Sequence, residues 1–398
     1  MKQKSPVRRV GFVVAAVVGV ILALNYIRPL PTITAAAASL STRLGAPTLD
    51  WPTAGQSAVG AVGYGVLDDS GEQSQLATAS VAKIITALTV LKVKPLSAGS
   101  QGPEITITAD DVALYNKYVA EDGSVVQVTQ GEQISEYQAL QAMLLPSGNN
   151  IADMLATWAY GSMDSYKTAA NNYINSIGMT GTNIGSDASG YSPDTTSTAP
   201  DLVRLGEAAM QNPVVAEIVG QKSAVLPGVG TVYNVDTIIG QDGIVGIKTG
   251  NNDQDTGVFL FAAKHTLSNN QTVTIVGTVM GQGSLQGAFD ASEALLDSAA
   301  AAFSVETPVA ANQTLVTYTV PWMKTTVNGV AKTPVSIAAW QGSVTLPHLS
   351  LPTVSGGQSA GATVGTVSVS AGANNASSSI VLKDAIPSPS FWWRLTRF

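Results

Sequence analysis

The sequence predicts an α+β protein with a helix-flanked antiparallel sheet, an all-helical part and a small all-β domain. Three observations predict this class. Strand-like segments lie at both ends of residues 58–303, helical patterns fill the stretch between them, and residues 304–386 are short strand-like segments separated by Gly, Pro, Asn and Ser. With 398 residues, the chain is long enough for two or three domains.

Residues 1–35 predict a membrane anchor or a signal peptide. The apolar run 10–27 would reach about 27 Å as a helix, just enough to span a bilayer core. The basic residues before it predict a cytoplasmic N-terminus and a translocated remainder; they are Lys2, Lys4, Arg8 and Arg9. Small residues at 34–39 offer cleavage sites, but the apolar run is long for a signal peptide. An uncleaved anchor is slightly favoured.

A catalytic domain is expected at residues 58–303, after a linker at 36–57. Residues 62–71 are typical of a strand and a turn. Helical patterns then lie at 78–91, 136–145, 150–161 and 165–179, and Thr198 with Asp201 resembles a capping box that opens another helix. After residue 240 the spacing changes: a hairpin is expected from strands at 256–264 and 271–281, and a helix at 285–303.

Two components are expected at the C-terminal end. Residues 304–386 predict a small β-sandwich-like domain with a flexible loop at 353–362. In the aromatic and basic tail, 387–398, one helical face would carry Phe391, Leu395 and Phe398. The neighbouring tryptophans suit a membrane interface. The alternative is that these aromatic residues pack against the β domain.

Composition limits the chemistry. The chain has no cysteine, which excludes disulfides, thiolate metal sites and cysteine nucleophiles. Its two histidines, His265 and His348, lie in turn-like contexts, and no metal or cofactor is expected. The net charge is −7 without a basic stripe, so nucleic-acid binding is not expected. A serine nucleophile would need a base of another type, and lysine is the main candidate.

A serine and a lysine open the apolar helix expected at 78–91. Ser80 and Lys83 lie three positions apart, so their side chains share one helical face. Ser80 is either an ordinary cap beside a solvated lysine, or a nucleophile at the positive helix end with Lys83 as its base. One S-x-x-K match is expected by chance, so this motif alone does not decide between them.

Two further motifs follow in the order that a lysine-based serine acyltransferase requires. Ser147 and Asn149 lie in the break between two expected helices. Lys248, Thr249 and Gly250 lie on an expected strand just before the hairpin. Each motif could be an ordinary turn or strand edge. All three motifs occur together in this order, each in a fitting structural context, and this combination indicates an active site.

With these motifs the sequence resembles the penicillin-binding serine D-alanyl-D-alanine carboxypeptidases, which share a fold with serine β-lactamases. The resemblance covers roughly residues 50–386 and includes "ASVAKIITAL", "LLPSGNNIADMLA" and "DGIVGIKTGNN". It implies cell-wall stem peptides ending in D-Ala-D-Ala as substrates, β-lactams as covalent inhibitors, and a place in the bacterial cell envelope. Asn251 and Asn252 follow K-T-G where many relatives carry His or an aromatic residue, which bears on fine substrate preference.

The resemblance also implies roles for the first two motifs. Ser80 would attack the carbonyl between the two D-alanines, and Lys83 would accept its proton. Burial and the second ammonium of Lys248 would lower the pKa of Lys83. Ser147 would relay a proton to the departing D-alanine, while Asn149 would orient Lys83 and the substrate amide.

The third motif would bind the substrate. Lys248 and Thr249 would hold the terminal carboxylate, and Gly250 would let the peptide approach the strand edge. The backbone N–H groups of Ser80 and Asn251 would form the oxyanion hole.

Three alternatives remain open. A β-lactamase needs a base for deacylation, and only Glu207 and Glu217 lie between the second and third motifs, both in helix-like contexts. A wall-binding protein with a retired active site would have no reason to keep all five polar motif residues. D,D-endopeptidase activity is harder to exclude, because the bond cleaved is chemically alike.

Overall fold

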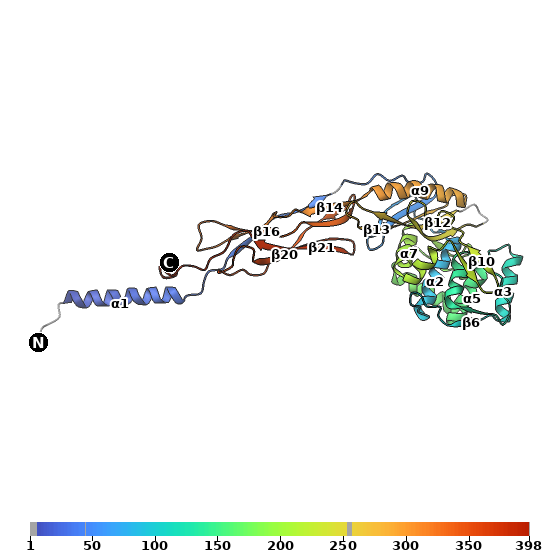
Figure 1. The fold of residues 1–398 in the computed structure, drawn as a ribbon, viewed down its shortest axis with the longest axis horizontal. Helices are drawn as coiled ribbons and strands as arrows, with labels where there is room; N and C mark the ends of the chain where they lie inside the picture. The colour runs from blue at the N-terminus through green and yellow to red at the C-terminus, as the bar shows by residue number, and fades with distance from the viewer. Residues whose placement is uncertain (1–5, 44, 253–256, 398) are drawn as a thin grey trace. The chain divides into compact units, whose positions relative to one another are not determined.

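The computed structural model describes residues 6–43, 45–252 and 257–397, and the chain forms two compact units (Figure 1). The helix-rich unit contains residues 45–305 and 338–342. The β-rich unit contains the N-terminal residues up to 44 together with 306–337 and 343–398.

A five-stranded antiparallel sheet organises the helix-rich unit. Its strand order is β11-β12-β13-β3-β4, with β3 Gln56–Ala61, β4 Gly65–Ser70, β11 Ile244–Gly250, β12 Val258–Thr266 and β13 Thr272–Met280. Alternate residues of β12 face two different cores, because Leu260 packs with the helical layer and Phe261 packs with α9, Leu285–Ala301. The expected antiparallel sheet flanked by helices is therefore confirmed.

The helical layer lies between β3–β4 and β11 in the sequence. It consists of α2 Ala82–Val93, α3 Ala109–Ala120, α4 Glu136–Leu144, α5 Asn149–Tyr160, α6 Met163–Ser176, α7 Ala199–Gln211 and α8 Pro213–Val219. Short strand pairs connect these helices: β5 Leu76–Ala77 with β8 Thr196–Ser197, β6 Glu104–Thr106 with β7 Gln133–Ser135, and β9 Ser223–Leu226 with β10 Gly230–Tyr233.

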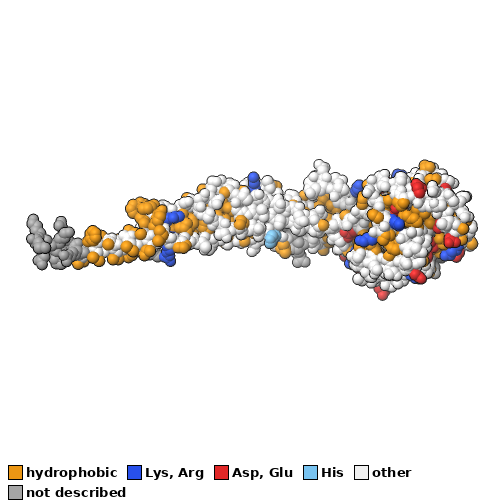
Figure 2. All heavy atoms as spheres, turned by 90° about the horizontal axis from the view of Figure 1, so that it is seen from below, with side chains coloured by type: hydrophobic (Ala, Val, Ile, Leu, Met, Phe, Trp, Pro, Cys, Tyr) orange, Lys and Arg blue, Asp and Glu red, His pale blue; other side chains and the backbone are white. Residues whose placement is uncertain are grey.

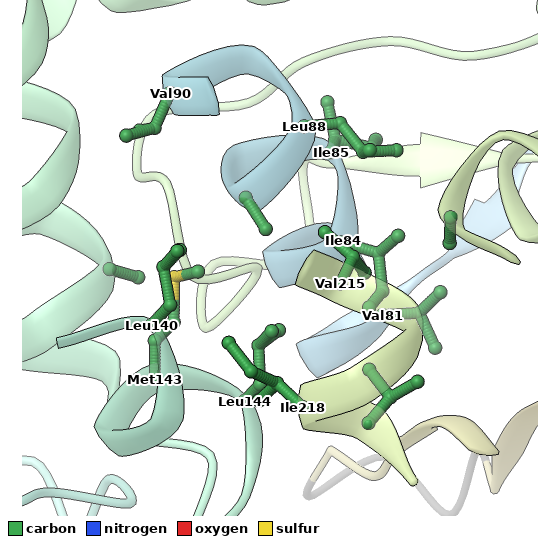
Figure 3. Close-up of a cluster of buried hydrophobic side chains, with 14 of the residues drawn as sticks. Val81, Ile84, Ile85, Leu88, Val90, Leu140, Met143, Leu144, Val215 and Ile218 are labelled. Atoms are coloured by element: carbon green, nitrogen blue, oxygen red, sulfur yellow. The ribbon is translucent and has the colours of Figure 1, made fainter. Parts of the chain in front are cut away.

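Helix α2 is the centre of this layer. It contacts α4, α5, α6 and α7, and all its residues from Ala82 to Leu91 are buried. Figure 3 shows Ile84 of α2 beside Val215 of α8, in a buried cluster that also contains residues of α4. A helix surrounded by other elements must be apolar on every side, which explains the uniform composition of the segment.

Several expected boundaries need correction. The strand expected within 62–71 is β4, whereas strand β3, which precedes it, was not expected. The expected capping box is only half formed. Thr198 accepts a hydrogen bond from the backbone N–H of Asp201, whereas the Asp201 carboxylate binds Gly181, Thr182 and Arg204.

The β-rich unit is built on a six-stranded sheet, with strand order β1-β15-β16-β21-β20-β19. Its strands are β1 Thr34–Ala37, β15 Thr314–Thr319, β16 Val327–Ala331, β19 His348–Ser350, β20 Thr363–Ala371 and β21 Asn374–Leu382. Strand β2, Thr42–Arg43, pairs with β18, Val344–Thr345; the remaining strands are β14 Phe303–Val309 and β17 Val335–Trp340. The linker expected at 36–57 is thus wrong in part, because it contains residues of β1, β2 and β3.

A helix lies near each end of the described part of the chain. Helix α1, Pro6–Ile27, is long and apolar enough to cross a membrane over Val10–Ile27, and Figure 2 shows hydrophobic side chains along it. Helix α10, Phe391–Thr396, forms in the tail. The expected positions Lys2, Lys4 and Phe398 lie outside the described residues.

Candidate active site

The first motif sits at the start of the buried helix. Ser80 lies in a single 3-10 turn, η1 Ala79–Val81, which leads directly into α2. The residue before it, Ala79, has φ +44°, a left-handed conformation that costs free energy in any residue with a Cβ. Strained residues of this kind are found mainly at functional sites.

Lys83 reaches three oxygen atoms from three segments of the chain. Its Nζ lies within hydrogen-bonding distance of Ser80 Oγ at 2.8 Å, Asn149 Oδ1 at 2.7 Å and the Ser189 carbonyl at 3.0 Å. The side chain is 0% exposed. The serine and lysine of the first motif and the asparagine of the second therefore form one hydrogen-bonded group.

Burial of Lys83 favours its neutral form. Loss of hydration holds the pKa of the Lys83 amine well below its usual value, and the nearby Lys248 ammonium lowers it further. The carboxylates of Asp187 and Asp153 act in the opposite direction. A neutral amine in contact with a serine hydroxyl is a base in position to accept its proton.

Two buried aspartates fix the segment that presents the Ser189 carbonyl. Asp187 accepts hydrogen bonds from the backbone N–H groups of Ser189 and of the two residues at 191–192. Asp153 accepts one from Ala188 N at 2.9 Å and one from the Tyr118 hydroxyl at 2.7 Å. Sequence reasoning missed these contacts. Of the two aspartates, only Asp153 could have been predicted to lie near the site. It follows Asn149 by four positions, so the two side chains share one face of the helix.

The second motif lies where α4 ends and α5 begins. Ser147 has φ +66°, and its Oγ is buried without a hydrogen-bond partner among the described residues. An unpaired buried hydroxyl costs free energy and needs an explanation. Asn149 is the first residue of α5, and its backbone N–H donates to the Ser124 carbonyl at 2.8 Å.

The third motif lies on edge strand β11. A Cβ atom on Gly250 would come within 2.7 Å of the Thr78 carbonyl and 3.2 Å of the Ala79 Cβ. Only a glycine therefore lets β11 lie against the turn that carries Ser80. Lys248 is buried, and its Nζ donates to the Thr249 carbonyl at 3.1 Å.

A buried carboxylate accompanies Lys248. Asp236 is 4% exposed; one of its oxygens accepts from Ile238 N, and the other has no hydrogen-bond partner among the described residues. Burial lowers the pKa of Lys248 to about 7, and the Asp236 charge opposes this change. Burial raises the pKa of Asp236 to about 6, and Lys248 opposes that change in turn.

A cleft of about 300 Å³ opens beside these residues. It is lined by Ser80, Asp122, Gly123, Ser124, Asn149, Gly190, Tyr191, Pro193, Asn251 and Asn252. The lining thus includes Ser80 and Asn149 from the first two motifs and Asn251, the expected oxyanion-hole residue, which follows the third motif. Groups of three or more His, Cys, Asp or Glu side chains suited to a metal ion do not occur in the described part of the chain.

Comparisons with known proteins agree with this geometry. Residues 59–283 match the model of the D-alanyl-D-alanine carboxypeptidase family, peptidase S11. The chain is 32% identical over 171 residues to D-alanyl-D-alanine carboxypeptidase DacB2 of Mycobacterium tuberculosis, covering 39% of this chain and 58% of that protein. It is 26% identical over 225 residues to DacA of Escherichia coli K12, covering 55% and 53%. The chain thus spans only about half to three fifths of these relatives.

Solved structures show the same fold. Penicillin-binding protein 5 of Haemophilus influenzae superposes with a TM-score of 0.59 at 19% identity, covering 86% of this chain and 99% of that one. The Streptomyces K15 DD-transpeptidase superposes with a TM-score of 0.55 at 24% identity, covering 63% and 98%. With the family match extending over more than half of the sequence, the chain belongs to the D-alanyl-D-alanine carboxypeptidase family of serine peptidases, peptidase S11.

Proposed function

We propose that this chain is a serine carboxypeptidase that removes the terminal D-alanine from peptidoglycan stem peptides ending in D-Ala-D-Ala. Ser80 Oγ attacks the carbonyl of the penultimate D-alanine, the terminal D-alanine leaves, and water hydrolyses the acyl-enzyme. β-Lactams acylate the same serine and are released slowly.

The observation that carries this proposal is the hydrogen bonding of Lys83. In the neutral amine, two N–H bonds donate to Asn149 Oδ1 and to the Ser189 carbonyl. The nitrogen lone pair then faces Ser80 Oγ, 2.8 Å away, and accepts its proton. The ammonium that forms has three donors for the same three oxygens, so proton transfer requires no rearrangement of the site.

The other motif residues complete the reaction. The ammonium of Lys248 and the hydroxyl of Thr249 bind the terminal carboxylate. The carboxylate oxygens supply further acceptors for the N–H groups of Lys248. The unpaired Ser147 hydroxyl passes a proton from Lys83 to the departing amine of D-alanine. The N–H groups of Ser80 and Asn251 bind the oxyanion of the tetrahedral intermediate.

The positions of two glutamates favour this activity over a β-lactamase. Glu207 accepts hydrogen bonds from the backbone of Gly63 and Gly65, and Glu217 accepts one from the Tyr137 hydroxyl at 2.6 Å. Neither residue lines the cleft, where Asp122 is the only acidic side chain among the lining residues. Neither Glu207 nor Glu217 therefore supplies the base that a β-lactamase uses for deacylation.

The test combines a mass measurement with a product assay. After exposure to benzylpenicillin, the full-length protein should gain the mass of one penicilloyl group, located on the peptide that contains Ser80. The Ser80→Ala variant should gain none. The wild type should release D-alanine from a peptide ending in D-Ala-D-Ala.

The other outcomes identify the alternatives. Rapid penicillin turnover without an accumulated adduct would indicate a β-lactamase. An adduct with cleavage only of cross-linked peptides would indicate a D,D-endopeptidase. Absence of both adduct and turnover would indicate a retired, wall-binding site.

A further inference from the structure

The end of helix α1 lies against the C-terminal helix within the β-rich unit. The Tyr26 and Phe391 rings pack with their centroids 5.6 Å apart, and the Arg394 guanidinium lies 5.5 Å from the centre of the Tyr26 ring. Asn25 Nδ2 donates a hydrogen bond to the Leu395 carbonyl at 3.2 Å. The first and last parts of the described chain therefore meet.

Arg397 binds carbonyl groups at the end of α1 and in the two residues that follow it. Its guanidinium donates to the Asn25 carbonyl at 2.9 and 3.1 Å, to the Pro29 carbonyl at 3.1 Å and to the Arg28 carbonyl. The last carbonyls of any helix lack partners inside the helix and attract a positive charge. Near a bilayer, where water is scarce, the need for such donors is greater.

The other side of α10 is fixed to the β-rich unit. Trp393 packs edge-on against Trp322 at 5.8 Å, and the Trp322 indole N–H donates to the Pro387 carbonyl at 2.7 Å. Phe391 and Trp392 stay 59% and 71% exposed. One tryptophan of the tail thus packs on the fold, whereas Phe391 and Trp392 remain on the surface.

The segment after α1 is also part of the fold. Residues 34–37, which lie within the run of possible signal-peptidase sites, form β1 and pair with β15 from Thr34↔Thr319 to Ala37↔Val316. Ala38 N donates to the Leu315 carbonyl at 2.9 Å. On either side of β1, Ile33 and Leu40 pack against the core of the β-rich unit.

From these contacts we infer that α1 is a permanent membrane anchor, retained in the mature protein and capped at its outer end by α10. The partner of this surface is the lipid bilayer: α1 crosses it, and Phe391 and Trp392 lie at its interface. Cleavage at 34–39 would cut within or just after β1, one of the two strands that pair with β15, and would remove the acceptors of Arg397 and the ring that Phe391 contacts.

The first test is the mass of the full-length protein extracted from bacterial membranes. Retention predicts a chain that still contains α1. An N-terminus between residues 34 and 39 would overturn the inference. Retention is independent of catalysis, so this result does not depend on the proposed function.

The second test uses the absence of cysteine from the chain, which gives a clean background for cross-linking. The pair Tyr26→Cys and Phe391→Cys should be joined in membranes by a short bifunctional thiol reagent, because the two native rings are in contact and the reagent spans the space that they leave. The control pair is Val17→Cys with Phe391→Cys. Val17 is on the same helix but about 13 Å further along its axis, so this pair should be joined far less by the same reagent. Equal cross-linking of both pairs, or none of either, would refute the contact between α1 and α10.

The third test addresses the lipid contact. Brominated lipids quench tryptophans at the interface, so part of the fluorescence of the wild type should be quenched. That part should be lost in the Trp392→Phe variant. Quenching unchanged by this substitution would show that Trp392 does not contact the bilayer.

Discussion

Asp236→Asn should change the pH dependence of acylation without changing the shape of the site. The substitution keeps an oxygen that can accept the hydrogen bond from Ile238 N, and it removes the negative charge that supports the Lys248 ammonium. The pKa of Lys248, about 7 in the native site, should therefore fall. Because Lys248 must be charged to bind a carboxylate, affinity for substrate should decrease.

The magnitude follows from the protonation equilibrium. If the pKa of Lys248 falls by about one unit, the ammonium fraction at pH 7 drops from about one half to about one tenth, an approximately fivefold loss. At pH values well below 6, both proteins would hold a charged Lys248 and the difference should shrink. Lys83 must be neutral and Lys248 charged, so the acylation rate should rise with pH through the pKa of Lys83 and fall through that of Lys248. Only the falling limb should move.

The assay is the second-order rate constant for acylation by benzylpenicillin between pH 5 and 9. Asp242→Asn is the matched control, since Asp242 is an exposed acid on the same stretch and asparagine also tolerates its positive φ. The falling limb of Asp236→Asn should lie about one pH unit below that of the wild type. The reasoning is refuted if the two limbs coincide while both proteins remain folded.

Three further substitutions test other parts of the structure. Lys83→Arg should reduce the acylation rate by about 10²–10⁴-fold, because a guanidinium does not release its proton. The control Lys92→Arg, on the same helix, should have no effect. A normal acylation rate in Lys83→Arg would show that another residue is the base. Burial raises the pKa of Glu136 from 4.5 to about 7, so the folded state binds a proton more tightly and stability should fall as pH rises through this range. Glu136→Gln should flatten the melting temperature against pH, and Glu104→Gln should leave its slope unchanged. Asp122→Asn, the acid in the cleft, should raise KM for peptides that carry a free amino group while leaving acylation by benzylpenicillin unchanged; an equal effect on both would mean that Asp122 supports the fold instead.

The sequence predicted the elements whose pattern repeats locally. The hairpin of β12 and β13, helices α4 and α5 and the break between them follow from spacing and turn residues alone. Strand β1 did not, because three alanines have little intrinsic strand preference. Their pairing partner, β15, lies almost 300 residues further along the chain, so the strand exists only in the folded unit.

The same distinction applies to the site. Residues that form short motifs could be identified from their order, and the structure brings Ser80, Lys83 and Asn149 into hydrogen-bonding contact. The third acceptor of Lys83 is a backbone carbonyl, which any residue type could supply, so no sequence pattern could reveal Ser189. The role of Asp236 also could not be predicted from the sequence, because its effect on the pKa of Lys248 depends on burial and on the fold that brings the two residues together.

The apolar composition of α2 links the fold to the chemistry of the site. An amphipathic helix on the surface would leave Lys83 hydrated and charged at neutral pH, since the ordinary pKa of a lysine is about 10.4. In the buried helix the amine loses its hydration, and the oxygens of Asn149 and Ser189 replace water without fully restoring the charged form. The packing of α2 among α4, α5, α6 and α7 therefore does more than stabilise the fold. In the proposed mechanism it also provides the low polarity that lets Lys83 take a proton from Ser80.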